Sequence, residues 1–118
     1  MGHYILVFLD ERRMEKIKGT EVENKIKTMF GGELKCIEVD VPDELSQKIL
    51  KTFDTARIDA RGAITDLPVA FMRELFNSIA EKKSVGPEVI EAVLSKADEI
   101  KEMAAKESEY LPPPDIEV

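Results

Sequence analysis

The sequence predicts an α/β fold: a small parallel or mixed sheet of two or three strands covered by helices, with a C-terminal helical hairpin. Two apolar runs, residues 4–9 and 34–41, have the composition of strands, and helical periodicity fills most of the chain between and after them. The chain has 118 residues, 43% of them hydrophobic, which is enough for one core. We expect residues 1–108 to form a single domain and 109–118 a proline-containing tail.

The first strand covers residues 4–9. This run is apolar throughout, is rich in β-branched and aromatic side chains, and ends abruptly at Asp10. A run of this kind is typical of a strand that is buried on both faces. A short helix is expected next, reaching to Gly19, with Asp10 as its N-cap.

A longer helix is predicted over residues 21–30. Thr20 and Glu23 have the spacing of a capping box, in which each side chain satisfies an unpaired amide. The apolar side chains that follow form one helical stripe: Val22, Ile26, Met29 and Phe30. The pair Gly31-Gly32 is expected to end the helix.

The second strand covers residues 34–41. Apolar residues at 37, 39 and 41 alternate with charged ones, so one face should meet water. If this strand neighbours the first and residues 10–30 form a helical crossover, the two strands are parallel. Pro42 begins a further helix, whose apolar face carries Leu45, Ile49, Phe53 and Ala56.

Residues 57–66 leave three alternatives: a short third strand, a loop, or an irregular continuation of the helix. Gly62 disfavours the helix. Asp66 is then expected to cap a helix over 67–82, and Pro87 begins a last helix over 88–106. The apolar seam of helix 88–106 fits either an intramolecular hairpin with helix 67–82 or a symmetric dimer.

Charge and composition exclude several classes of protein. The chain has 17 basic and 24 acidic residues, a net charge of −7, which argues against coating of double-stranded nucleic acid. It has no run of 18 apolar residues and no signal-peptide pattern, so a cytoplasmic protein without membrane contact is expected. The single cysteine, Cys36, excludes an internal disulfide and is interpreted as a buried structural thiol. Abundant Lys and Glu with few side-chain amides favours a heat-adapted source.

Acidic side chains stand at the predicted ends of both strands. Asp10 follows the first strand, and Asp40 lies at the end of the second. In parallel strands these two acids would share the edge where α/β sheets bind ligands, and there they could hold Mg²⁺. The alternative is that each acid only caps the helix after it, and on that ground no metal ligand is assigned. His3 is the only histidine and stands near the N-terminus, so no catalytic residue is predicted.

The segment 57–66 is the strongest sequence candidate for a ligand-binding loop. It holds Asp59, Arg61 and Asp66, with Gly62 allowing close approach to the backbone. Arg61 has the chemistry to clamp a carboxylate or a phosphate. The alternative is a structural tie, in which Arg57 pairs with Asp59 or Arg61 pairs with Asp66. No phosphate-binding glycine motif occurs.

Two functions follow as hypotheses. The first is a non-catalytic interaction or regulatory module that forms a homodimer through helix 88–106 and the C-terminal tail, with no cofactor. The second is a small enzyme or ligand-binding protein for an anionic or Mg-bound small molecule, using Asp10, Asp40 and Arg61. Whether the protein is an enzyme stays open. Single-stranded nucleic acid is disfavoured, because the chain is acidic and has only seven Phe and Tyr residues.

Overall fold

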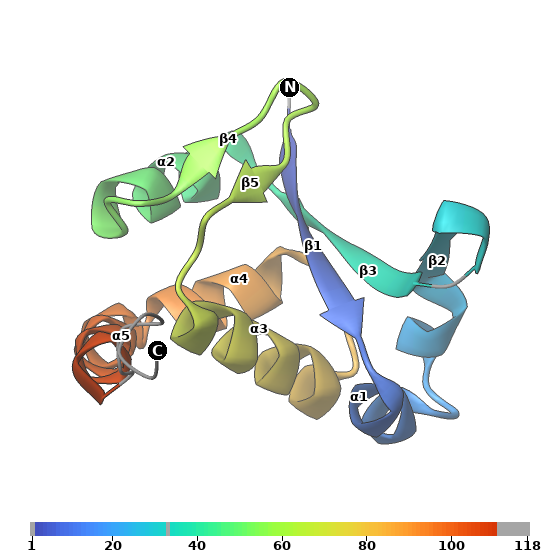
Figure 1. The fold of residues 1–118 in the computed structure, drawn as a ribbon. Coiled ribbons are helices and arrows are strands. Elements are labelled where there is room, and N and C mark those ends of the chain that lie inside the picture. The colour runs from blue at the N-terminus through green and yellow to red at the C-terminus, as the bar shows by residue number, and fades with distance from the viewer. Residues whose placement is uncertain (1, 33, 111–118) are drawn as a thin grey trace, which may run out of the picture.

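A small antiparallel sheet forms the centre of the protein. The computed structural model describes residues 2–32 and 34–110. Strands β1 (His3–Leu9), β2 (Ile26–Met29) and β3 (Leu34–Val41) pair in the order β1-β3-β2, and both pairs are antiparallel (Figure 1). The combination of helices and a small sheet confirms the α/β character of the chain.

The expected parallel pairing of the first two predicted strands is wrong. His3 lies opposite Val41 and Leu9 lies opposite Lys35, so β1 and β3 run in opposite directions. The reason is the additional strand β2, which precedes β3 in the chain and pairs with its other side. The crossover from β1 therefore leads to β2 across the sheet, and a tight turn then brings β3 back between them.

The helix expected over residues 21–30 is also wrong. The chain forms a 3-10 helix, η1 (Glu21–Lys25), then β2, then a second 3-10 turn, η2 (Phe30–Gly32). Thr20 stands at the N-cap of η1, but its side chain makes no capping hydrogen bond. Its Oγ1 instead donates to the carbonyl of Ile17 at 2.7 Å. Pairing with β3 places Ile26 beside the fully buried Ile37, so sheet packing outweighs the local helical pattern.

Residues 2–32 and 34–110 include five α-helices, which pack mainly against one side of the sheet. Their bounds are α1 (Glu11–Ile17), α2 (Asp43–Thr52), α3 (Val69–Lys82), α4 (Pro87–Leu94) and α5 (Ala97–Tyr110). The predicted apolar face from Leu45 to Ala56 is buried, although α2 itself ends at Thr52. Within the described ranges, no helix is both long and apolar enough to cross a membrane.

Two helix boundaries differ from the expectation. Pro68 rather than Asp66 stands at the N-cap of α3, and Asp66 has a left-handed backbone with φ 60°. The single helix expected over 88–106 is interrupted, because α4 ends at Leu94 and α5 begins at Ala97. Of the predicted tail, residues 109–110 belong to α5 and residues 111–118 lie outside the described part of the chain.

Residues 57–66 form a hairpin rather than a helix or a simple loop. Strand β4 (Arg57–Ile58) pairs antiparallel with β5 (Ile64–Thr65). The amide of Tyr4 donates to the carbonyl of Gly62 at 3.2 Å, which attaches the hairpin to the beginning of β1. Gly62 has φ 93°, a conformation that glycine adopts without strain.

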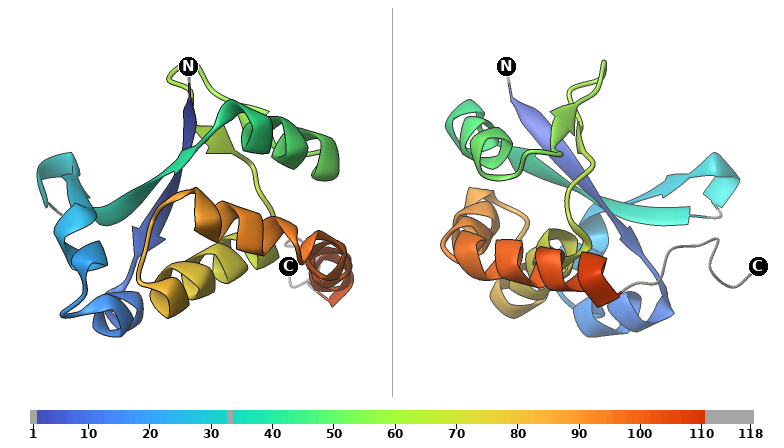
Figure 2. Two further views of the ribbon diagram at one scale, coloured as in Figure 1. Left: turned by 180° about the vertical axis from the view of Figure 1, so that it is seen from behind. Right: turned by 60° about the vertical axis from the view of Figure 1, so that its left-hand side comes forward.

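The hydrophobic core lies between one face of the sheet and the helices. Figure 2 shows α3 and α4 packed together under the sheet, and α5 also contacts α3. Ile5 and Val7 of β1 point into this core. Phe8, the next residue after Val7, lies on the opposite face of the strand and is 48% exposed. The expectation that the first strand is buried on both faces is therefore wrong, since its outer face is only partly covered.

Candidate functional site

The structure separates the two acids that were expected to share one edge of the sheet. Asp40 lies opposite Tyr4, near the start of β1, whereas Asp10 follows the end of β1, where Leu9 lies opposite Lys35. At about 3.4 Å per residue, the five steps from Lys35 to Asp40 span roughly 17 Å. Asp10 and Asp40 therefore cannot bind one ion together. No group of three or more His, Cys, Asp or Glu residues in the described chain is placed to hold a metal.

Asp10 has the capping role that its position suggested. Its Oδ1 accepts a hydrogen bond from the amide of Arg13 at 2.9 Å. This bond, together with the nearby charges of Arg13 and Arg12, lowers the pKa of the Asp10 carboxyl. Asp40 instead lies exposed beside a cleft of mixed charge that also contains Lys25 and Lys83.

The hairpin 57–66 is tied mainly to itself. Asp59 Oδ1 accepts hydrogen bonds from the amides of Arg61 (2.8 Å) and Ala63 (2.9 Å), and these bonds lower the pKa of Asp59. Arg57 Nε lies 3.9 Å from Asp66 Oδ2, so the ion pair differs from both pairs expected from the sequence. Since this hairpin is attached at Tyr4, Arg61 stands near the Asp40 end of the sheet and away from Asp10.

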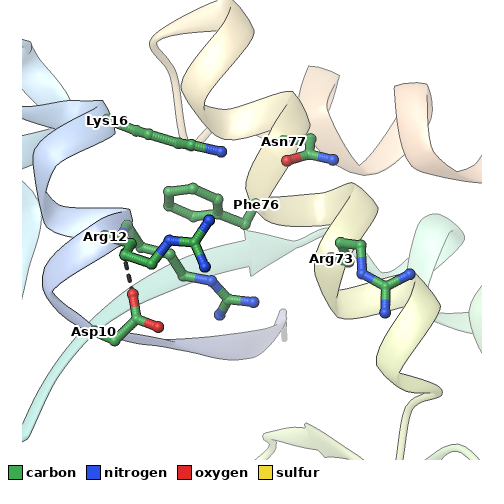
Figure 3. Close-up of a pocket in the computed structure, with 7 residues that line it drawn as sticks. Asp10, Arg12, Lys16, Arg73, Phe76 and Asn77 are labelled. Atoms are coloured by element: carbon green, nitrogen blue, oxygen red, sulfur yellow. Dashed lines mark hydrogen bonds between the residues drawn. The ribbon is translucent and has the colours of Figure 1, made fainter.

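A different cleft, between α1 and α3, gathers basic side chains. The cleft is open to solvent, and its volume of about 290 Å³ is at the small end of the range for ligand pockets. Figure 3 shows the residues that line it. The lining residues are Asp10, Arg12, Arg13, Lys16, Arg73, Phe76 and Asn77.

The α1 side of the cleft follows from the amphipathic pattern of that helix. Ile17 is buried in the core, which leaves Arg12 and Lys16 on the exposed side, one helical turn apart. Figure 3 shows the side chains of Arg12 and Lys16 extending from α1 toward α3. The polar face of this short helix thus becomes one wall of the cleft.

The opposite wall belongs to α3. Phe71, Leu75 and Ile79 point into the core and are fully buried. Arg73 and Asn77 are again one turn apart and lie on an exposed flank of α3. Phe76, only 2% exposed, forms the floor between the two walls.

Arg13 is fixed where the two walls meet. Its Nη1 donates to the carbonyl of Phe8 at 3.0 Å, and its guanidinium carbon lies 5.2 Å from the centre of the Phe76 ring. The hydrogen bond and the cation–π contact hold the charge in one position before any ligand arrives. Arg13 therefore supplies a preorganised positive charge at the floor of the cleft.

The electrostatics of the cleft oppose those of the whole chain. Among the described residues, the lining has four cationic side chains and one carboxylate, a formal charge of +3, whereas the chain carries −7. Within the described part of the chain, the side chains of Arg12 and Lys16 make no hydrogen bond or ion pair. Such a site attracts anions and has hydrogen-bond donors left to bind them.

The lining favours binding over chemistry. It contains no Ser, Thr, Cys, Tyr or His side chain to act as a nucleophile or to exchange a proton near neutral pH. Asp10 is its one carboxylate, and a lowered pKa makes it a weak base. The cleft is thus equipped to hold oxyanions by hydrogen bonds and charge.

Two sequence features indicate this cleft, although only Asp10 of its lining was among the predicted site residues. Arg12, Arg13 and Lys16 form a basic group in an acidic chain, and Arg73 and Asn77 have helical spacing beside Phe76. The sequence did not show that α1 and α3 lie next to each other, because their contact joins residues about sixty positions apart.

Comparison with known proteins places the chain in a family. A family model described as "Family of unknown function (DUF6955)" matches residues 3–94, a range that includes every residue lining the α1–α3 cleft. No curated protein and no solved structure matches the chain. The chain therefore belongs to this family.

Proposed function

We propose that this member of the DUF6955 family is a non-catalytic binding or regulatory module that holds a small anionic ligand in the cleft between α1 and α3. The observation that carries the proposal is the gathering of Arg12, Arg13, Lys16 and Arg73 around one cleft of a strongly acidic chain. Like charges brought together in this way repel one another, and a bound anion relieves that repulsion.

The state of the side chains supports the same proposal. Arg13 is held by Phe8 and Phe76 and loses little freedom when a ligand binds. Arg12 and Lys16 are exposed and reach over the opening. A fixed charge at the floor and exposed charges at the rim together form a binding site that an anion can enter from solvent.

The alternative of a small enzyme that uses Asp10, Asp40 and Arg61 has less support. Its residues were expected at one edge of a parallel sheet, and the antiparallel register separates Asp10 from the other two. The anionic ligand of this alternative is kept in the present proposal, but its site moves from the strand ends and Arg61 to the α1–α3 cleft.

Thermal unfolding with a panel of anions tests the proposal. Sulfate, phosphate and citrate are compared at constant ionic strength, using the full chain, Arg12→Gln and Arg61→Gln. A ligand at 100 times its Kd adds about 2.7 kcal/mol to the free energy of unfolding, which is readily measured. We expect at least one anion to stabilise the wild-type chain and Arg61→Gln, and to stabilise Arg12→Gln much less.

Two results would overturn the proposal. If no anion stabilises the wild-type chain, the cleft is not a binding site. If Arg61→Gln loses the effect and Arg12→Gln keeps it, the anion binds at the hairpin 57–66. Arg61→Gln is a matched control, because it removes the same exposed charge from a different part of the surface.

Self-association through helix 88–106 and the tail stays a prediction. Four apolar side chains of that segment, Val89, Ile90, Val93 and Ile100, are buried in the chain's own core, which leaves less apolar surface for a second copy. Light scattering on the full chain and on a chain ending at Glu107 tests it. A dimer that dissociates on truncation would support the prediction, and a monomer in both cases would contradict it.

A further inference from the structure

We infer that the α1–α3 cleft selects compounds with linked phosphate groups, such as a pyrophosphate or tripolyphosphate moiety, over single phosphates and over carboxylates. This inference rests on the proposed function and names the chemical class of its ligand. It follows from the spacing of the cations, their number, and what the cleft lacks.

The basic and polar groups stand in two rows. Arg12 and Lys16 are one turn apart on α1, and Arg73 and Asn77 are one turn apart on α3. Side chains at this spacing begin about 5–6 Å from each other along each helix. Two linked phosphates present oxygens over a comparable length, so both ends of the rows can donate to the same ligand.

The charge of the lining points to a multiply charged ligand. The side chains of Arg12 and Lys16, which pair with no described residue, carry two positive charges, more than one carboxylate neutralises. Guanidinium groups bind phosphate oxygens through two parallel hydrogen bonds, and a lysine ammonium adds a point charge. Each further phosphate therefore adds contacts in addition to charge.

The described lining offers no exposed aromatic or large apolar side chain to a ligand. Its only aromatic residue, Phe76, is 2% exposed and is covered by Arg13. The large apolar side chains that are exposed in the described chain lie outside the lining: Phe8, Leu34, Ile58 and Val69. The cleft thus recognises the anionic part of a ligand, and the remainder extends into solvent.

Calorimetric titration of the full chain tests this inference. Orthophosphate, pyrophosphate, tripolyphosphate and citrate are compared at constant low ionic strength with EDTA present, so that no metal contributes. We expect Kd to fall about tenfold with each added phosphate, the gain of one further charge-assisted contact. Citrate, which carries several charges on carboxylates, is expected to bind more weakly than pyrophosphate.

Substitutions in the two rows of side chains test whether these residues cause the selectivity for linked phosphates. Lys16→Gln and Arg73→Gln should reduce the affinity for tripolyphosphate more than the affinity for orthophosphate, because a single phosphate does not need both ends. Arg61→Gln, the matched control, should leave both affinities unchanged. Circular dichroism confirms that each variant is folded.

The outcomes separate this inference from the proposed function. If orthophosphate binds at the cleft but pyrophosphate and tripolyphosphate bind no better, the selection for linked phosphates is wrong and the anion site stands. If citrate equals pyrophosphate, the cleft senses charge alone and the inference is again overturned. If no anion binds, both proposals are wrong.

Discussion

Two neighbouring residues of the cleft, Arg12 and Arg13, have different physical roles. Arg13 is half-buried, donates to the Phe8 carbonyl and covers the Phe76 ring. Arg12 is exposed and makes neither kind of contact within the described residues. Arg13 therefore stabilises the fold as well as placing a charge at the floor of the cleft, whereas Arg12 has no structural contact and is left for a ligand.

This difference predicts opposite effects on stability. Arg13→Gln should lower the free energy of unfolding by about 1–2 kcal/mol, because a charged hydrogen bond and a cation–π contact are lost. Arg12→Gln should change it by less than about 0.5 kcal/mol, as is usual for exposed residues. Urea unfolding measures both, and equal effects of the two substitutions would contradict this assignment of roles.

Asp10 gives a pH-dependent prediction. Because the pKa of Asp10 is lowered in the folded chain, its carboxylate stabilises the fold above its ordinary pKa of about 4, and this contribution is lost as the pH falls below that value. Asp10→Ala should therefore unfold at a lower temperature than the wild-type chain at pH 7. The gap in Tm should narrow as the pH falls from 7 to below about 4, because wild-type Asp10 then becomes protonated.

Thermal melts of both chains across that pH range measure the gap. Asp54→Ala is a suitable comparison, since Asp54 is an exposed acid that lies outside any helix. A gap between wild type and Asp10→Ala that is the same at pH 7 and pH 3 would show that the capping bond is not formed by the ionised carboxylate.

At the level of single elements, the largest difference from the prediction is strand β2, which occupies residues expected to be helical. Lys27 Nζ lies 2.6 Å from Glu38 Oε1, and this bond raises the pKa of Lys27. The contact exists only if residues 26–29 pair with β3, because a helix over 21–30 would not hold Lys27 in the sheet beside Glu38. The pair is thus a direct test of the strand.

Reversing these charges makes the test. Lys27→Glu and Glu38→Lys should each destabilise the fold, since each places like charges side by side. The double variant should recover most of the loss, and unfolding of all four chains gives the coupling between the two residues. Purely additive effects would mean that Lys27 and Glu38 are not neighbours.

Much of the element structure was predictable, for identifiable reasons. The bounds of β3, the N-cap at Asp10 and the helix start at Pro87 depend on local rules of alternation, capping and proline geometry, and they are confirmed. The predictions of one continuous helix over 21–30 and over 88–106 were wrong, because tertiary packing outweighs the local helical pattern of these segments. Residues 26–29 complete a sheet, and the chain turns after Leu94 so that α4 and α5 both reach α3.

The candidate site could not be predicted, because it depends on the arrangement of the whole molecule. Residues lining one wall are some sixty positions from those lining the other, and only the folded chain brings Arg13 of α1 onto Phe76 of α3. The antiparallel direction of β1 and β3 separates Asp10 from Asp40. Because β1 and β3 are antiparallel rather than parallel, the site expected at the ends of both strands does not form.

At the scale of the whole molecule, charge is segregated. The chain carries −7, yet the cleft lining carries a formal +3, so the surface elsewhere is more acidic than the net charge suggests. A cationic site on such a surface selects small anions that can enter the cleft, because large polyanions meet the surrounding negative surface. Under the proposed function, the cleft of this acidic protein therefore binds small phosphates and not nucleic acid.

The most direct test is a nuclear magnetic resonance titration of the full chain with pyrophosphate. If the central claim holds, the backbone amide signals that move most belong to residues 11–17 and 73–77, and those of residues 57–66 stay in place. The shifts should saturate at a ligand concentration that rises with added salt, since screening weakens the attraction. Shifts concentrated in residues 57–66, or the absence of any saturable shift, would contradict the assignment of the α1–α3 cleft as the anion site.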